Sequence, residues 1–162
     1  MIVAKNAMDR LLRAAAQARR RAYAPYSGFR VGAAVLADGR VYAAVNVENS
    51  SFPLSVCAER NAVAAAVAGG ARHVEAIAIV GGDSRPTPPC GGCRQVLAEF
   101  ASSEAPVVYG TEAGNRVSTT LGALLPRAFG PSDLRAPAGP EEGGSTSSSA
   151  GRAPGMRRRS RR

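Results

Sequence analysis

The N-terminal part of the chain shows two kinds of hydrophobic pattern in succession. Over residues 5–24, KNAMDRLLRAAAQARRRAYA, apolar side chains recur every three or four positions, a spacing that predicts an amphipathic helix. Two runs follow, RVGAAVLA and RVYAAVNVE, and both are rich in residues that favour strands. Asp38-Gly39 joins them and is a strong hairpin signal between apolar runs. We therefore predict a helix followed by two antiparallel strands.

The chain then alternates between helices and short buried strands as far as residue 134. One helix is expected from Cys57 to about Ala68, ended by Gly69-Gly70, and another from about Gly91 to Ala101. The apolar runs VEAIAIVG and PVVYG are expected to be strands, and TTLGALLPRAF a short helix or turn that closes the domain. The predicted order, α-β-β-α-β-α-β, implies a mixed sheet with helices packed on its faces.

Charge divides the 162-residue chain at about residue 134. The net charge is +9, of which residues 135–162 contribute +5 (seven Arg, two Glu) and residues 1–134 contribute +4 (fourteen Lys or Arg, ten Asp or Glu). The last segment consists largely of Gly, Pro, Ser and Arg and cannot bury enough apolar surface to offset the entropy of chain ordering. We predict a folded domain at residues 1–134 and a disordered basic tail at residues 135–162.

The number of cysteines and the lengths of the apolar runs indicate the cellular compartment in which the protein is expected. Three cysteines are too few, and odd in number, for a disulfide framework, which fits the reducing cytoplasm. No apolar run reaches the ~20 residues that a membrane helix needs, and the start, MIVAKNAMDRLL, is a poor signal peptide. Arg19, Arg20 and Arg21 are expected to form a solvated helix end. We expect a cytoplasmic protein without a membrane partner, in which only the tail is a candidate for contact with nucleic acid.

The three cysteines, Cys57, Cys90 and Cys93, all lie where a helix is predicted to begin. Cys90 and Cys93 form a C-x2-C pair, which suits two thiolates on one metal, and the positive end of the helix dipole lowers thiol pKa values. This pair alone also fits a redox couple or two buried structural cysteines, but the third cysteine favours zinc. The single histidine, His73, is expected at the surface. Three protein ligands leave one position for water, as in catalytic zinc sites.

Glu59 follows Cys57 by two residues and is expected in the first turn of the helix, pointing into the same pocket. A glutamate there also suits the helix dipole, but beside a zinc ion we interpret Glu59 as a proton shuttle. Three thiolates on one divalent cation leave a formal charge of −1, so nearby positive charge is expected. Arg60 and Arg94 are the candidates to donate hydrogen bonds to cysteine sulfur; for Arg94, a surface position is an equal alternative.

Together these motifs resemble the zinc-dependent cytidine deaminases. CAE followed by PCGGCRQ is similar to the H-x-E…P-C-x-x-C signature of zinc nucleobase deaminases, with cysteine in place of histidine. YAPYSGFRVGAAVLADG, NVENSSFPLSVCAER and LLPRAFGPSDL also match, over about residues 5–134. The all-cysteine pattern resembles the small homotetrameric members that act on free nucleosides. This resemblance implies a three-layer α/β/α fold with a mixed five-stranded sheet, one zinc ion per subunit and active sites at subunit interfaces.

The resemblance also implies a reaction and a set of substrate contacts. Water attacks C4 of the pyrimidine, while Glu59 takes a proton from that water, delivers it to ring N3 and assists the departure of ammonia. Asn46 and Glu48 match residues that bind the ribose hydroxyls, and their spacing at a strand end puts them on the same side. Phe29 matches an aromatic that packs on the pyrimidine ring, and the backbone around Ala58 is expected to contact the base. Phe129 matches an aromatic that reaches into a neighbouring subunit's site.

Two other functions fit parts of the sequence. One is a deaminase that acts on another pyrimidine-like amine or on a base in RNA, and the other is a zinc-stabilised RNA-binding protein that uses the RRRSRR tail. The NVEN motif and the lack of a compact basic groove favour a free nucleoside, and Arg-rich tails usually bind polyanions weakly. We therefore expect hydrolytic deamination of cytidine and deoxycytidine to uridine and deoxyuridine, in pyrimidine salvage.

Overall fold

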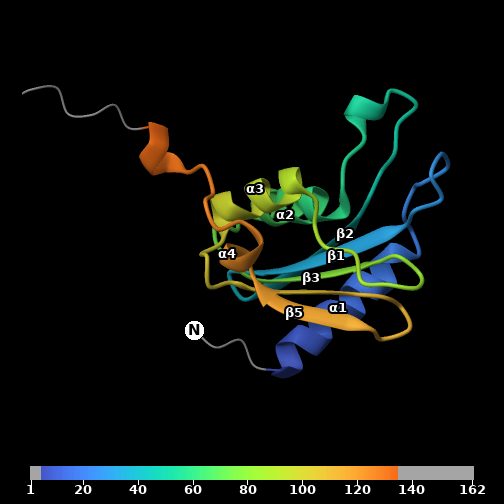
Figure 1. Cartoon of the computed structure of the whole chain (residues 1–162), viewed down its shortest axis with the longest axis horizontal. Helices are drawn as coiled ribbons and strands as arrows, with labels where there is room; N and C mark the ends of the chain where they lie inside the picture. The colour runs from blue at the N-terminus through green and yellow to red at the C-terminus, as the bar shows by residue number, and fades with distance from the viewer. Residues whose placement is uncertain (1–4, 135–162) are drawn as a thin grey trace, which may run out of the picture.

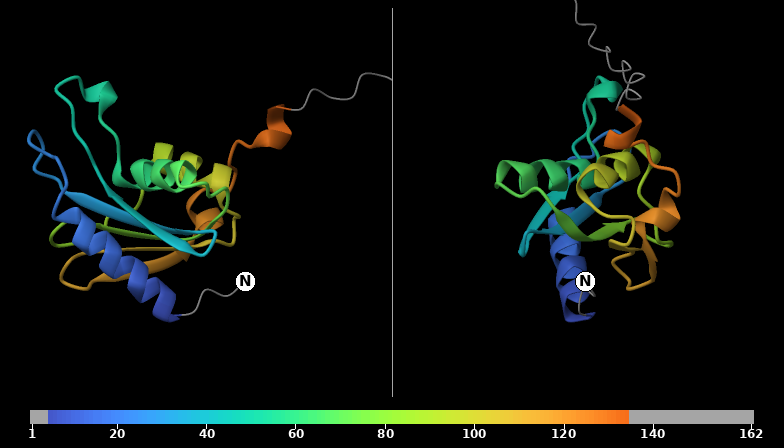
Figure 2. Two further views of the ribbon diagram at one scale, coloured as in Figure 1. Left: turned by 180° about the vertical axis from the view of Figure 1, so that it is seen from behind. Right: turned by 90° about the vertical axis from the view of Figure 1, so that its left-hand side faces the viewer.

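The protein is a three-layer α/β/α sandwich, described here from a computed structural model over residues 5–134 (Figure 1). Helix α1 (Lys5–Arg19) lies across one face of a central sheet, and α2 (Ala58–Ala68) and α3 (Gly91–Phe100) cover the opposite face (Figure 2). This confirms the expected fold class. The predicted tail, residues 135–162, lies outside the described residues, so its boundary and its disorder stay predictions.

The sheet is mixed and has five strands in the order β2-β1-β3-β4-β5. Only β3 and β4 pair in parallel, whereas each other neighbouring pair is antiparallel. Asp38 and Gly39 connect β1 to β2 with φ values of 45° and 74°, as a tight hairpin turn with two left-handed residues requires. The strands span Val31–Ala37 (β1), Arg40–Val45 (β2), Val74–Gly81 (β3), Pro106–Gly110 (β4) and Arg116–Thr120 (β5).

The edge strand β5 is the element that the hydrophobic pattern did not locate. Its sequence, RVSTT, holds a single large apolar side chain, Val117, which is 40% exposed. An edge strand with a solvated face shows little apolar alternation, so nothing marks it as buried. The first two residues of the segment that was expected to be a short helix or turn, TTLGALLPRAF, belong to this strand. The helix α4 that follows is therefore shorter and spans Leu121–Leu124. Thr120 caps α4, because its side chain accepts a hydrogen bond from the Ala123 N–H.

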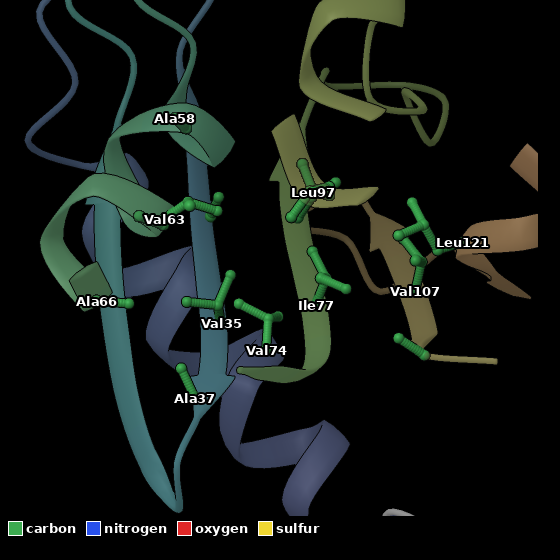
Figure 3. Close-up of a cluster of buried hydrophobic side chains, with 14 of the residues drawn as sticks. Val35, Ala37, Ala58, Val63, Ala66, Val74, Ile77, Leu97, Val107 and Leu121 are labelled. Carbon is green, nitrogen blue, oxygen red and sulfur yellow. The ribbon is translucent and has the colours of Figure 1, made fainter. Parts of the chain in front are cut away.

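A separate apolar core lies on each face of the sheet. Beneath α2 and α3, larger side chains from the strands and helices pack together, among them Val35, Ile77, Leu97, Val107 and Leu121 (Figure 3). Beneath α1 the core consists of Leu11 and Val80 together with four alanines, namely Ala15, Ala34, Ala76 and Ala78. The small side chains allow α1 to approach the sheet closely. Among the described helices, none is long and apolar enough to span a membrane.

The strand directions bring two helix starts to the same edge of the sheet. Val45 at the end of β2 and Gly81 at the end of β3 flank the beginning of β1, because they pair with Gly32 and Val31. Helix α2 follows β2 through a loop that contains a 3-10 turn, η1 (Phe52–Leu54), and α3 follows β3. Both helices therefore begin above one edge of the sheet, where open α/β sheets bind ligands.

The contact between α1 and β1 predicts a sensitive position at Gly32. A Cβ atom placed there would lie 2.0 Å from the Ala15 carbonyl oxygen and 2.6 Å from the Arg19 nitrogen, so helix and strand would have to separate. We expect Gly32→Ala to lower the free energy of unfolding by about 1–3 kcal/mol, as overpacking does. Urea unfolding of the zinc-loaded protein measures this.

The matched control is Gly130→Ala, because a Cβ atom at Gly130 meets nothing within 4 Å. Its free energy of unfolding should stay within about 0.5 kcal/mol of the parent value, as for most surface substitutions. Equal stability of the Gly32 and Gly130 variants would contradict the close approach of α1.

Candidate metal and active site

The three cysteines meet at the shared edge of the sheet, as the sequence predicted. Their sulfur atoms all lie within 4.8 Å of one another. The Cys57 and Cys90 sulfurs are 4.0 Å apart, and those of Cys90 and Cys93 are 3.4 Å apart. His73 is exposed and is absent from this cluster, which confirms its surface position.

Two of the three cysteines occupy the same place at the start of a helix. Cys57 is the N-cap residue of α2 and Cys90 is the N-cap residue of α3, both with extended backbone and neither with a side-chain capping hydrogen bond. Each carbonyl still begins its helix, because Cys57 O accepts from Asn61 N and Cys90 O accepts from Arg94 N. A thiol therefore stands where a capping oxygen normally lies, beside the positive end of the helix dipole.

The sulfur spacing fits a single tetrahedral zinc ion. Two sulfurs that are each ~2.3 Å from a tetrahedral zinc lie roughly 3.8 Å apart, and the two measured separations bracket this value. The donor set is also that of zinc, because three thiolates are soft ligands that Mg²⁺ and Ca²⁺ do not select. Cys57, Cys90 and Cys93 are therefore placed to hold one zinc ion.

The thiols have different acidities because they influence one another. The pKa of Cys57 is lowered to about 5, chiefly because its sulfur accepts a hydrogen bond from Cys93, with a further contribution from the positive charge of Arg60. The pKa of Cys93 is raised, because that hydrogen bond and burial both favour its neutral form. Without a cation, the cluster therefore retains a proton on Cys93 that zinc binding would displace.

Glu59 is the buried carboxyl group of the site. It lies in the first turn of α2, is only 5% exposed and lines the same cavity as Cys57 and Cys90, as predicted. Burial raises the pKa of Glu59, and the negative charge at Cys57 raises it further, whereas the Glu59 backbone N–H acts in the opposite direction. A carboxyl with a raised pKa suits proton transfer near neutral pH.

The two arginines expected beside the cysteines have different surroundings. Arg60 donates to the Ser55 carbonyl at 3.0 Å and is close enough to Cys57 to lower the pKa of that thiol. Arg94 donates instead to the carbonyls of Pro89 (2.9 Å) and Leu124 (2.8 Å), and so joins the start of α3 to the end of α4. These two carbonyls occupy the Nε and one Nη group of Arg94. A hydrogen bond from Arg94 to a cysteine sulfur therefore stays a prediction.

Cys57, Cys90 and Glu59 line a cavity of about 180 Å³. Phe29, Asn46 and Ala58 also line it, so three of the five predicted substrate contacts lie together with the cysteine cluster. Sequence reasoning did not identify the rest of the wall, which consists of Val31, Ile79, Gly81, Thr87 and Pro88. Thr87 and Pro88 are adjacent to the PCGGC motif, but only the fold shows that the loop after β3 bends toward Phe29.

The two polar residues of the NVEN motif both contact the loop that precedes β1. Asn46 accepts from Val31 N and donates to the Phe29 carbonyl, each at 2.8 Å. Glu48 accepts from the backbone N–H groups of Tyr26 and Ser27. The two side chains thus point to the same side, as expected, although Glu48 is not among the described residues that line the cavity.

Phe129 lies apart from the cavity of its own chain. It is 58% exposed, and its carbonyl accepts a hydrogen bond from the Gln95 side chain at 2.7 Å. The segment that carries it leaves the α2–α3 layer and leads to the 3-10 turn η2 (Pro131–Leu134) away from the sheet (Figure 1). The structure therefore does not bring Phe129 together with the other predicted site residues.

Comparison with known proteins agrees with this geometry. Residues 5–111 match the family model described as the cytidine and deoxycytidylate deaminase zinc-binding region. The chain is 48% identical over 130 residues to the cytidine deaminase of Halalkalibacterium halodurans (78% of this chain, 98% of the relative). It is 44% identical over 128 residues to that of Sporosarcina psychrophila (78% and 94%). A crystal structure of cytidine deaminase from Burkholderia pseudomallei superposes with a TM-score of 0.71 at 47% identity (75% and 98%).

The thiol acidities predict how zinc binding depends on pH. Cys57 is already ionised at neutral pH, whereas Cys93 must lose its proton to become a ligand. Zinc affinity should therefore rise as the pH rises, by about tenfold per pH unit for each proton displaced. Competition with a chromophoric chelator at several pH values measures the affinity, and an affinity that does not change with pH would contradict the prediction.

Proposed function

The chain belongs to the cytidine deaminase family, and from this premise we propose that it hydrolyses cytidine and deoxycytidine to uridine and deoxyuridine with release of ammonia. The enzyme is a hydrolase of a cyclic amidine C–N bond and uses one zinc ion per subunit. One observation carries the proposal: a 5% exposed glutamate shares a cavity with two members of a three-cysteine cluster at paired helix starts. Metal ligands and a proton-transfer group are the two parts that the reaction needs.

Cys57, Cys90 and Cys93 would hold the zinc ion, and Glu59 would move the protons. When bound, zinc supplies Lewis-acid activation of water near neutral pH. Glu59 accepts a proton from the attacking water and donates it to N3 of the pyrimidine, which makes C4 more electrophilic. The carboxylate then takes the second proton of the water, from the new C4 hydroxyl, and delivers it to the amino group, so that the C4–N bond breaks, ammonia leaves and the C4 carbonyl forms. The raised pKa of Glu59 supports both directions of transfer, because the carboxyl gains and loses a proton within one cycle.

Positive charge next to the cluster would support its activity. Three thiolates leave a formal charge of −1 on the metal site, which weakens its ability to acidify water. Arg60 lowers the pKa of Cys57 and so stabilises the thiolate form of that ligand. Arg94 fixes the start of α3 through two backbone carbonyls and would contribute through this placement.

The size of the cavity supports a division between base and sugar binding. At about 180 Å³ it is smaller than typical ligand pockets of ~300–1,000 Å³. We assign the pyrimidine to this cavity, against Phe29 and the backbone at Ala58, and the ribose to its rim. Asn46 and Glu48 would bind the ribose hydroxyls there, and each carries spare hydrogen-bonding capacity beyond its contacts with the loop.

A homotetramer with active sites at subunit interfaces fits the exposed apolar side chains near the cavity. Tyr26 and Phe52 form an edge-to-face pair and are 51% and 68% exposed, and Leu54 is 65% exposed. Such a patch favours association. Phe129, which is exposed and does not line the cavity of its own chain, would then enter that of a neighbouring subunit. For the cell, we assign the enzyme to pyrimidine salvage in the cytoplasm, with the basic tail at 135–162 dispensable for catalysis.

The direct test is the fall in ultraviolet absorbance when zinc-loaded protein is added to cytidine. We expect turnover of cytidine and of deoxycytidine, by the full chain and equally by residues 1–134. An inactive zinc-loaded protein would refute the proposed function. If RNA binding that requires the tail were then the only detectable property, the RNA-binding alternative would be supported.

Glu59→Gln tests the proton shuttle. An amide keeps the shape of the side chain but cannot carry the proton, so kcat should fall by about 10²–10⁴-fold, while zinc content and cytidine binding change little. Metal analysis and calorimetric titration provide these two measurements. Glu99→Gln, on an exposed position of α3, is the matched control and should keep the parent rate. Near-parent turnover by a zinc-loaded Glu59→Gln protein would rule out the role of Glu59.

A further inference from the structure

The hydroxyl of Ser27 lies between the two kinds of substrate contact proposed above. It donates a hydrogen bond to one carboxylate oxygen of Glu48, Oε1. It also accepts a hydrogen bond from the Phe29 backbone N–H at 2.9 Å. One side chain thus joins the carboxylate assigned to the sugar with the residue assigned to the base.

Glu48 is fixed in place by this loop and still has capacity for a ligand. Its other oxygen, Oε2, accepts from Tyr26 N at 2.9 Å and from Ser27 N at 3.2 Å. With the Ser27 hydroxyl, three of the roughly four acceptor positions of a carboxylate are filled, and one remains for a ribose hydroxyl. The hydrogen bond from Ser27 is the main cause of the lowered pKa of Glu48, so the group stays ionised as an acceptor.

Phe29 is held on both sides by groups that belong to the sugar-binding residues. The Phe29 N–H donates to the Ser27 hydroxyl, which in turn donates to Glu48. The Phe29 carbonyl accepts a hydrogen bond from the Asn46 side chain at 2.8 Å. Gly28, between Ser27 and Phe29, has a φ of 69°, a left-handed conformation that lets the chain turn back on itself. The position of Phe29 at the cavity therefore depends on the same hydrogen bonds that orient Asn46 and Glu48.

We propose that Ser27 is a positioning residue that couples ribose recognition by Glu48 to placement of Phe29 against the pyrimidine. This inference rests on the proposed function. The proposed role differs from simple stabilisation of the loop. If the Ser27 hydroxyl acts through Glu48, its loss must matter most for substrates that carry the ribose hydroxyl bound by Glu48. The backbone bonds from Tyr26 and Ser27 to Glu48 remain when the hydroxyl is removed, so the loop keeps two of its three ties to Glu48.

The test compares Ser27→Ala and Ser27→Thr on cytidine and on analogues that lack the 2′- or the 3′-hydroxyl. For Ser27→Ala we expect KM for cytidine to rise about tenfold, as for loss of one hydrogen bond to a charged group, with kcat within about threefold of the parent value. The loss in kcat/KM should be several-fold smaller for the analogue that lacks the hydroxyl bound by Glu48. Ser27→Thr, which keeps the hydroxyl, should restore the KM.

A double-mutant cycle with Glu48→Ala, which removes the acceptor of the Ser27 hydroxyl, adds a second readout. If Ser27 acts through the carboxylate, Ser27→Ala should change kcat/KM much less in the Glu48→Ala background than in the parent. Ser102→Ala, at an exposed serine beyond the end of α3, is the matched control. Calorimetric binding of uridine reports the same loss of affinity without turnover.

Two failures can be told apart. A parent protein that does not deaminate cytidine refutes the proposed function itself. If the parent is active, an equal loss of kcat/KM on every substrate, an additive double mutant, or no change in Ser27→Ala overturns the coupling role. A lowered melting temperature accompanied by an equal loss on all substrates would show that Ser27 only maintains the loop.

Discussion

The site depends on one geometric constraint, the meeting of two helix N-termini at a single edge of the sheet. The antiparallel pairing of β1 with both β2 and β3 places the ends of those two strands on either side of the start of β1. The helices that follow then present Cys57 and Cys90 from opposite sides, with Cys93 one turn into α3. The sulfur cluster is therefore a product of sheet topology, and a change of strand order would separate the ligands.

Charge makes the members of the site mutually dependent. Burial is the main cause that disfavours ionisation of Glu59, whereas for Cys93 the hydrogen bond to Cys57 comes first and burial second; the negative charge at Cys57 disfavours ionisation further in both. A divalent cation would reverse this balance at the sulfurs, because it stabilises thiolates that otherwise repel one another and the carboxylate. The arrangement is thus unfavourable as a set of free acids and becomes favourable as a metal site, which accounts for three thiols and a carboxyl group lying so close together.

Elements marked by local chemistry could be predicted from the sequence, whereas those fixed by long-range contact could not. Asp38-Gly39 and Gly69-Gly70 fixed the hairpin and the end of α2, because glycine marks left-handed turns and helix ends. The edge strand β5 was missed because its polar face shows no alternation. Within the site, the cysteine cluster and Glu59 were found from their spacing. Thr87 in the cavity wall depends on where a loop folds back, which no local pattern encodes.

Because α2 and α3 lack side-chain caps, metal binding is expected to affect the stability of the folded protein. A conventional N-cap contributes roughly 0.5–2 kcal/mol to a helix, and at both helices a sulfur occupies that position without making the bond. Zinc would therefore join the starts of the two helices as well as serve as a cofactor. Starvation for zinc would then shorten the survival of the protein against proteases, so that scarcity removes the enzyme itself and not only its activity.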